Sequence, residues 1–496
     1  MDSPRYEASG AGGVASGAGG VATAPAVAAI EQRGIDYVPP RSRWGRPVDL
    51  FWMWAGAIVN IEFVVYGTLI IAAFKLSFEQ ALIVIVIGNL FYLLTGVLSL
   101  QGPQAGTTAF TISRAPFGIR GNRVLAIFNW LTQVGFETEG VALVVLAGLA
   151  LATKAGYHPG TPLKVALIII AAAIQLVLPL LGHSTIMRVL RILTFPFIAL
   201  FIILAILTTP KVNLSAPHLG ANWETMLVAV VLVISAGGLG WTENANDYSR
   251  YLPRSTSQGR VVWWVFLGGF IPSVLLEVLG AAVATGVPSS TDPISGLPHA
   301  FPSWFLVPYL IVAIVQLFCI NTIDLYSSGV TLQSIGLKLK RVHCVLIDTV
   351  VCCGLTAYAI FSSSFSTLLS DFLSFIIIWL GPWAAIYLVD WLLRGGRYDV
   401  RSLFARAGGL YWRHGGANWP GLVAQLVGMV AAAMWINTLP FSGPLSTLTN
   451  GADLSIYMGI VFGGVIYFVL ARGQVRREAA ATPAGEPDLA GLERVA

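Results

Sequence analysis

Long apolar stretches alternate with short polar connections along most of the chain, and this pattern predicts a bundle of membrane-spanning helices. About 20 apolar residues are needed for one helix to cross a hydrocarbon core of about 30 Å. Twelve stretches of roughly that length follow one another, over approximately 50–73, 79–100, 124–152, 163–182, 189–208, 225–246, 260–286, 304–336, 343–361, 367–393, 420–439 and 455–471. We therefore expect an all-α integral membrane protein with about twelve transmembrane helices.

Composition and charge support a membrane protein and predict its orientation. The 496 residues are 56% hydrophobic and only 11% charged, whereas a soluble domain carries about 25% charged residues. A soluble globular enzyme is thereby excluded. Of the 29 lysines and arginines, only Lys75, Lys154, Lys164 and Lys211 fall in loops on the side opposite the termini. Because basic residues concentrate in cytoplasmic loops, we expect a multi-pass plasma-membrane protein with both termini in the cytoplasm.

Two of the predicted spans carry glycine and polar residues near their middle. These interruptions lie around residues 56–62 in the first span and 237–246 in the sixth. Irregular backbone at that depth is tolerated only where it is buried in protein or lines a cavity. Broken helices at corresponding positions of two halves indicate the midplane site of a transporter. In the alternative interpretation, Gly56, Gly237, Gly238 and Gly240 only allow close helix packing.

The spacing of the two interruptions predicts how the chain is divided. Five spans separate them, and a repeat of an odd number of spans must be inverted in the membrane. The expected parts are a cytoplasmic tail over 1–48, inverted repeats over 49–209 and 224–393, two further helices within 419–471, and a cytoplasmic tail over 472–496. Residues 1 to about 29 have low complexity and resemble a disordered tail rather than a signal peptide. We expect the polar segment 31–49 to lie at the membrane surface.

Acidic residues inside the predicted spans have no basic partner there. They are Glu62, Glu137, Glu139, Glu243, Glu277, Asp324 and Asp348. A carboxylate in a low-dielectric interior must be protonated, hydrogen-bonded, hydrated or paired with a bound cation, and each outcome suits proton or ion movement. We expect Asp348 to be hydrated near a loop. Structural roles are the alternative for Glu62, as a bridge between the broken helix ends, and for Glu277.

Five segments in order resemble the nucleobase-cation symporter family, in its purine-cytosine permease branch. The similarity covers approximately residues 31–394 and is carried by IEQRGIDYVPP, SRAPFGIRG, GWTENANDYSRYLP, NTIDLYSSGVTLQSIG and WLGPWAAIYLVDW. The resemblance implies alternating access in a five-plus-five inverted-repeat fold with two extra C-terminal helices. It also implies a flat heterocycle held between an aromatic residue of the third span and one of the sixth.

The resemblance implies a set of substrate-binding residues in this sequence. Trp241 matches the aromatic residue of the sixth span, and Phe136 stands where relatives carry the tryptophan of the third. An amide side chain can satisfy a neighbouring donor and acceptor on a nucleobase edge, and stacking on an aromatic face contributes about 1–3 kcal/mol per base. The expected substrate-binding residues are Asn60, Phe136, Gly140, Gly240, Trp241, Asn321 and Asp324.

Departures from the family pattern bear on the substrate and the coupling ion. Asp324 is an acid where relatives carry an amide, so an amino-bearing ring such as cytosine or adenine, or a basic vitamin precursor, suits the site. Sodium-coupled relatives use hydroxyls about one turn before the eighth-span asparagine, and this sequence has Val315 and Gln316 there. Coupling to H+ through an acid is therefore favoured over Na+. The candidates for ion or proton coupling are Glu62, Glu139 and Asp324.

Other function classes fit the sequence less well. The six histidines fall in loops or at span ends, and no phosphate-binding loop or metal-ligand spacing occurs, so neither an enzyme nor a metal or cofactor site is expected. A passive channel would not need two broken helices. The four cysteines fall in apolar runs as core residues. Allantoin, hydantoin or a vitamin precursor are alternative substrates within the family, and an amino-acid or amine carrier of the same fold is a remoter alternative. The expected partners are a small heterocycle and the lipid bilayer, without nucleic acid or an obligate protein partner.

Overall fold

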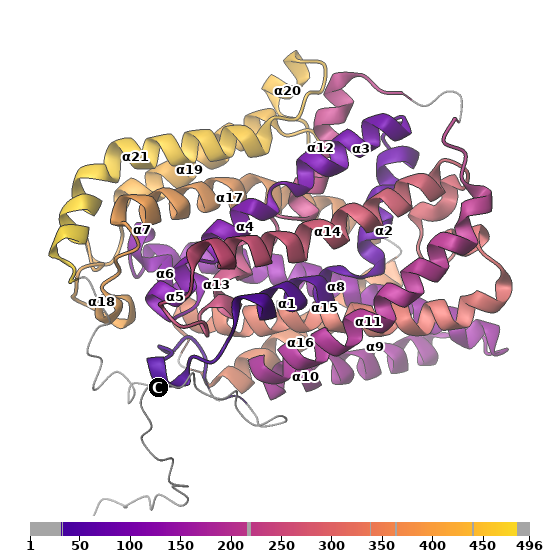
Figure 1. The fold of residues 1–496 in the computed structure, drawn as a ribbon, viewed down its shortest axis with the longest axis horizontal. Helices are drawn as coiled ribbons and strands as arrows, with labels where there is room; N and C mark the ends of the chain where they lie inside the picture. The colour runs from indigo at the N-terminus through magenta and orange to yellow at the C-terminus, as the bar shows by residue number, and fades with distance from the viewer. Residues whose placement is uncertain are drawn as a thin grey trace, which may run out of the picture.

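The described part of the chain consists of α-helices, most of which run roughly parallel to the long axis of the molecule (Figure 1). The computed structural model describes residues 31, 33–215, 220–337, 339–362, 365–438 and 441–483. Within these ranges no β-sheet forms, and Asn437 and Ser442 make one isolated bridge.

The first half of the chain forms eleven α-helices, several of them short pieces of one span. They are α1 (Pro47–Ile58), α2 (Ile61–Ala72), α3 (Phe78–Asn89), α4 (Tyr92–Leu98), α5 (Gln101–Ala105), α6 (Ala109–Ile112), α7 (Arg114–Phe117), α8 (Gly121–Lys154), α9 (Thr161–Gln175), α10 (Val177–Leu181) and α11 (His183–Thr208). Two 3-10 turns flank them, η1 (Pro40–Ser42) and η2 (Thr209–Lys211).

The second half begins with a broken helix and continues with longer rods. It contains α12 (Trp223–Ala236), η3 (Thr242–Asn244), α13 (Ala245–Ser249), α14 (Gln258–Ala284), η4 (Pro288–Thr291), η5 (Leu297–Ala300), η6 (Ser303–Phe305), α15 (Leu306–Ile335), α16 (Arg341–Ser362), α17 (Phe365–Arg394), α18 (Val400–Phe404), α19 (Trp419–Trp435), α20 (Pro444–Leu448) and α21 (Ser455–Ala481).

Each of the twelve expected spans contains an apolar helix in the structure. Among the described residues, nine helices are long and apolar enough to cross a membrane, α1 and α2 form a further span bent by 61°, and α12 and α19 are shorter apolar helices. Two details differ from expectation. The last helix continues to Ala481, ten residues past the expected end at 471, and the second span is interrupted at Leu90–Phe91, between α3 and α4.

The outer faces of the bundle carry large apolar side chains. Ile169 is 58% exposed, Val350 71% and Leu426 63%. A soluble protein rarely exposes so many apolar side chains together, whereas lipid tails solvate them without cost. These faces are therefore the lipid-contacting surface of a protein that spans a membrane.

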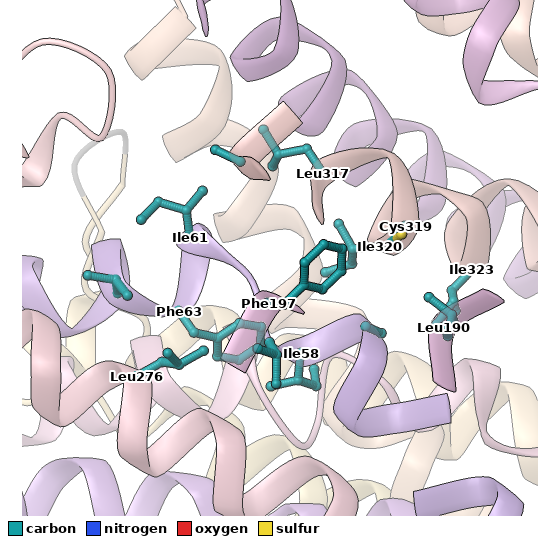
Figure 2. Close-up of a cluster of buried hydrophobic side chains, with 14 of the residues drawn as sticks. Ile58, Ile61, Phe63, Leu190, Phe197, Leu276, Leu317, Cys319, Ile320 and Ile323 are labelled. Carbon is teal, nitrogen blue, oxygen red and sulfur yellow. The ribbon is translucent and has the colours of Figure 1, made fainter. Parts of the chain in front are cut away.

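Helices from distant parts of the sequence meet around the break between α1 and α2. Figure 2 shows Ile58 and Phe63, from the two sides of this break, in one apolar cluster with Phe197 of α11 and Ile320 of α15. All four side chains are almost fully buried. The cluster places the broken helix in the middle of the protein, surrounded by other helices and away from lipid.

Close backbone contact joins α2 to α14 at two glycines. A Cβ atom added at Gly67 would lie 1.9 Å from the carbonyl oxygen of Glu277, and one added at Gly280 would lie 1.9 Å from that of Val64. Small residues at helix interfaces allow such approach in membrane proteins. The α2–α14 packing therefore depends on both glycines.

Both described ends of the chain lie at the same end of the molecule. The indigo segment before α1 and the last turns of yellow α21 are both at the left of Figure 1, beside α5, α6 and α18. We call this end the N-terminal face. An even number of spans places the two ends on one side of a membrane, as the sequence predicts.

Replacing Gly280 with alanine tests the α2–α14 contact. We expect the Gly280→Ala variant to be destabilised by about 1–3 kcal/mol, because the added methyl group overlaps backbone that cannot move aside cheaply. Thermal unfolding of the purified protein in detergent measures the effect. Gly354→Ala is the matched control, since nothing lies within 4 Å of a Cβ atom there. Equal melting temperatures for both variants would contradict the packing.

Candidate functional site

The break between α1 and α2 is held by a single asparagine. Asn60 is the N-cap of α2, where its Oδ1 accepts a hydrogen bond from the backbone N–H of Glu62 at 2.7 Å. Its Nδ2 donates to the carbonyl oxygen of Ala57 at 2.8 Å, at the end of α1. One amide thus satisfies a freed donor and a freed acceptor. The bridging role considered for Glu62 belongs to Asn60.

The second break lies between α12 and η3 and rests against the interruption between α3 and α4. A Cβ atom at Gly238 would lie 2.2 Å from the backbone N of Tyr92, so only glycine fits there. Thr95 of α4 donates its hydroxyl to the carbonyl oxygen of Gly238 at 2.5 Å. Both breaks expected from the sequence are confirmed, and the interruption of the second span provides the partner for the second of them.

A small cavity lies between the two breaks and the long helices α8 and α15. It is lined by Glu62, Phe63, Tyr66, Phe136, Ala236, Trp241, Ile320, Asn321 and Asp324. Its volume is about 10 Å³, which is room for about one water. Five of the residues expected at the site therefore meet here, in a narrow state that a ring would have to widen.

The other expected site residues lie close to the cavity without lining it. Asn60 is engaged at the helix break, as described above. A Cβ atom at Gly140 would lie 2.2 Å from Oδ1 of Asn321, and one at Gly240 would lie 2.2 Å from the carbonyl oxygen of Ser235. Gly140 thus lets α8 approach Asn321, and Gly240 allows the turn before Trp241.

Four aromatic side chains line the cavity, and Trp241 and Phe136 are the two expected from the sequence. Trp241 lies at the end of the second break, just before η3, and is 7% exposed. It makes an edge-to-face contact with Trp54 of α1, with ring centroids 5.6 Å apart and planes at 75°. Phe136 comes from α8. The two rings supply faces on which a planar ligand can stack.

Carboxyl groups dominate the polar lining. Glu62 and Asp324 line the cavity, and Glu139 is close enough for these three acids to repel one another electrostatically. Oδ1 of Asp324 is buried with no hydrogen-bond partner among the described residues. No lysine or arginine lines the cavity, and no group of three potential metal ligands occurs in the described part of the chain. The lining favours a ligand that donates hydrogen bonds.

Sequence reasoning missed Tyr66 and Phe63 as lining residues. Tyr66 lies one helical turn after Glu62, so the i, i+4 spacing was the available signal. Its ring makes an edge-to-face contact with Phe63 at 5.5 Å. Phe63 carried no such signal, because it is one of many apolar residues in the first span.

Two further acids in the spans, Glu277 and Asp348, accept hydrogen bonds from other side chains. Glu277 accepts a hydrogen bond from Nδ2 of Asn89 at 2.7 Å. Asp348 is fully buried and accepts hydrogen bonds from the indole N–H of Trp130, at 2.8 Å, and from the hydroxyl of Ser328. The expectation that Asp348 is hydrated near a loop is therefore wrong, because α8 and α15 cover it with polar partners.

The residues around α13 close the path from the cavity to the N-terminal face. Tyr248 donates its hydroxyl to the carbonyl oxygen of Ile323 at 2.7 Å, which ties the end of the sixth span to α15. Its ring lies 5.6 Å from that of Tyr326. On α15, Ile323 directly precedes Asp324, and Tyr326 follows Asp324 in the direction of Ile335, where the helix ends. The sixth and eighth spans, both from the second half of the chain, are thus in direct contact on this side of the cavity.

A second layer of closure comes from the segment before α1, which we call the N-terminal strap (Glu31 and residues 33–38). Oε1 of Glu31 accepts a hydrogen bond from the hydroxyl of Tyr251 at 2.5 Å, and Oε2 accepts one from the backbone N–H of His183 at 2.7 Å. Arg250 donates to the carbonyl oxygen of Gly34 at 2.7 Å. This segment is therefore packed into the protein, whereas the sequence suggested a position at the membrane surface.

The strap continues across the eighth span and the loop after α5. The backbone N–H of Ile35 donates to Gln333 of α15 at 3.1 Å, and its carbonyl oxygen accepts from the hydroxyl of Thr107 at 2.6 Å. Burial opposes ionisation of Glu31, but the nearby cations Arg341 and Arg250 hold its pKa below the usual value. Glu31 is therefore a partly buried anion at neutral pH and the central anchor of the strap.

Comparisons with known proteins show which family this chain resembles along most of its length. Residues 37–459 match the family model described as permease for cytosine/purines, uracil, thiamine, allantoin. The chain is 28% identical to a provisionally named purine-cytosine permease of Bacillus subtilis, YxlA, over 91% of this chain and 98% of that protein. It is 25% identical to the purine-cytosine permease fcyB of Emericella nidulans, over 90% and 89%.

Solved structures show the fold. The transporter Mhp1 of the nucleobase-cation-symport-1 family, in a closed conformation with bromovinylhydantoin bound, superimposes with a TM-score of 0.73 at 17% identity, over 91% of this chain and 97% of that one. The likeness confirms the expected all-helical transporter fold.

Substituting Glu31 tests the closure of the N-terminal face. We expect Glu31→Gln to speed tryptic cleavage after Arg33 about tenfold or more, because hydrogen bonds to a charged group contribute about 1.5–3 kcal/mol each. The pKa of Glu31 lies below its unfolded value, so its contribution is present at neutral pH and is lost as the pH falls through that lowered pKa.

Limited proteolysis in detergent with intact-mass readout measures the cleavage rate. Asp36→Asn is the control within the strap, since Asp36 accepts only a local hydrogen bond from the N–H of Gly34 at 3.3 Å among the described contacts. Equal cleavage of Glu31→Gln and wild type would show that Glu31 does not anchor the strap.

Proposed function

Because the chain belongs to the family of permeases for cytosine/purines, uracil, thiamine and allantoin, which are secondary transporters and not enzymes, we propose that it imports an amino-bearing nucleobase or a closely related heterocycle with protons. The observation that carries this proposal is the cavity between the two helix breaks. It combines two aromatic faces, Trp241 and Phe136, with the amide of Asn321 and the carboxyl groups of Glu62 and Asp324.

The proposed binding mode uses each type of side chain for one feature of the ligand. The ring stacks between Trp241 and Phe136 and widens the narrow cavity by parting them. Asn321 reads one edge with its amide oxygen, while Nδ2 donates to the carbonyl oxygen of Glu137 at 3.1 Å. Asp324 accepts from an exocyclic amino group through its unpaired Oδ1. Such a site discriminates strongly against rings that lack the donor, since a buried acceptor left unpaired costs about 1–3 kcal/mol.

The composition of the cavity wall supports coupling to protons. Three neighbouring acids without a basic partner in the lining cannot all be ionised at low cost. Binding of a proton or a cation relieves their repulsion. The position matched to sodium-liganding hydroxyls carries Val315, which is 37% exposed, and the buried Gln316. A hydroxyl set for Na+ is therefore missing at this position, which supports H+ as the coupling ion.

We propose that both tails, 1–48 and 472–496, face the cytoplasm, so that the N-terminal face is the cytoplasmic one. The distribution of basic residues along the sequence supports this orientation. The strap and the Tyr248–Ile323 contact then close the inner exit. Alternating access would break these contacts to release substrate and re-form them on return.

Trp241 provides the first test of the substrate site. We expect Trp241→Ala to weaken binding of labelled cytosine or adenine by about tenfold or more, because it removes a stacking face worth about 1–3 kcal/mol. Trp241→Phe retains a face and is expected to bind measurably. Equilibrium binding to purified protein, with thermal unfolding as a check on folding, gives the result. An affinity of Trp241→Ala within about twofold of wild type would contradict the assignment.

A competition panel identifies the ligand within the proposed class. Unlabelled cytosine, adenine, uracil, allantoin, hydantoin and a pyrimidine vitamin precursor are added against the labelled ligand. Amino-bearing rings are expected to compete best. Preference for allantoin or hydantoin would favour the alternative substrates within the family and would remove the role proposed for Oδ1 of Asp324.

Glu139 tests the coupling mechanism. In proteoliposomes, we expect Glu139→Gln to reduce uptake driven by an imposed pH gradient while leaving substrate exchange at equal pH largely intact, because the amide cannot carry a proton through the cycle. Glu224→Gln, at the start of α12 and away from the cavity lining, is the control. Unchanged gradient-driven uptake in Glu139→Gln would move the role to Glu62 or Asp324. Uptake that follows a sodium gradient would overturn proton coupling.

A further inference from the structure

A second and much larger cavity opens on the N-terminal face. Its volume is about 550 Å³, whereas the cavity between the helix breaks has about 10 Å³. Its walls come from the strap, α7, the start of α8, the connection between α15 and α16, and the residues after α18. The volume lies within the range of about 300–1,000 Å³ typical of ligand pockets. None of the residues that line the substrate cavity contributes to it.

Basic side chains dominate the lining of this cavity. They are Arg114, Arg123, Lys340, Arg341 and Arg406, whereas Asp36 is the one acidic lining residue. They come from four separate parts of the chain, so the cluster is created by the fold and not by a basic run in the sequence. A concave wall with one sign of charge focuses the electrostatic potential and raises the local concentration of counter-ions.

Most of this positive charge is not neutralised by the protein. Arg341 lies close to Glu31, and Asp36 accepts only the N–H of Gly34 among the described contacts. For Arg114, Arg123 and Lys340 no ion pair with a carboxylate occurs in the described part of the chain. Arg406 likewise forms no ion pair with a carboxylate among the described residues. The cavity therefore keeps an excess of positive charge.

Arg114 is held rigidly at the wall of the cavity. Its Nη1 donates to the carbonyl oxygen of Leu403 at 2.8 Å, and its Nη2 donates to that of Ser334 at 3.4 Å. Its Nε is buried without a hydrogen-bond partner in the described part of the chain. Burial and the nearby charge of Arg123 lower the pKa of the Arg114 guanidinium to about 10, so it remains charged at neutral pH. A bound anion would stabilise the neighbouring positive charges of Arg114 and Arg123.

We propose that this cavity binds a phosphate-type anion, held by Arg114 at the wall and by Arg123, Lys340 and Arg406 at the more exposed positions. Guanidinium groups match phosphate oxygens in a bidentate geometry, and an ammonium group adds a compact charge. The same chemistry is presented by free inorganic phosphate and by the headgroup of an anionic phospholipid. Basic pockets between transmembrane helices are a recurrent setting for such headgroups.

Two binding experiments on the full chain distinguish the two sources of phosphate. Inorganic phosphate is titrated into protein purified in a neutral detergent, with chloride at equal ionic strength as the reference, because screening alone changes electrostatic binding. The rise in melting temperature reports binding. In parallel, native mass spectrometry counts phosphatidylglycerol molecules retained by the protein, with phosphatidylcholine as the neutral lipid.

The variant Arg123→Gln/Lys340→Gln/Arg406→Gln removes the three exposed charges and leaves Arg114 in place. The matched control is Arg397→Gln/Arg476→Gln/Arg477→Gln, which removes three exposed charges outside the cavity. We expect the first variant to lose at least tenfold in affinity and the control to keep wild-type affinity. Loss of phosphate stabilisation indicates a site for the free ion, and loss of phosphatidylglycerol alone indicates a lipid headgroup. Equal binding by both variants overturns the proposal.

Chemical footprinting on the wild-type protein keeps the proposal testable if the triple variant does not fold. Phenylglyoxal modifies exposed arginines, and peptide mass spectrometry reports each position. Phosphate or phosphatidylglycerol is expected to protect Arg123 and Arg406 while Arg397 reacts at an unchanged rate. Protection of all three arginines alike, or protection of Arg123 by cytosine or adenine and not by phosphate, overturns an anion site and points to general screening or to a substrate pathway.

Discussion

Every backbone group freed inside the membrane must find a partner within the protein, and the structure around the two helix breaks depends on this requirement. Asn60 meets it at the first break by bridging Ala57 and the N–H of Glu62. Thr95 meets it at the second by binding the carbonyl oxygen of Gly238. Because these partners come from inside the bundle, the breaks are forced into its centre. The cavity between them is a direct consequence of that placement.

The chemistry of the cavity follows from its position. Side chains that project from the breaks and from α8 and α15 meet where no lipid headgroup or bulk water is available. Glu62 and Asp324 are therefore acids with few ways to be stabilised other than a proton, a cation or a donor on a ligand. Aromatic and aliphatic side chains, together with Asn321, form the rest of the lining. A state with room for about one water keeps these acids away from solvent while no substrate is held.

The sequence was most informative where a local rule was broken. Glycines and polar residues in the first and sixth spans violate the apolar pattern, so both breaks could be located before the structure was known. The interruption between α3 and α4 was missed, although Gly88 and Asn89 directly precede it, and it lies where Gly238 packs against Tyr92. The role of Glu31 as an anchor could not be predicted from the sequence either. Its partners His183, Arg250 and Tyr251 lie more than a hundred residues away, and only the fold brings them together.

The strap gives the closed N-terminal face and the basic cavity a shared wall. Ile35, Asp36 and Tyr37 line the cavity, while Glu31 holds the same segment against Tyr251. Arg341 belongs to both, since it lines the cavity and lies close to Glu31. A ligand that binds one state of a protein better than another shifts the population toward that state by its difference in affinity. An anion in the proposed site would therefore favour the docked strap, and opening of the N-terminal face would have to disrupt part of that site.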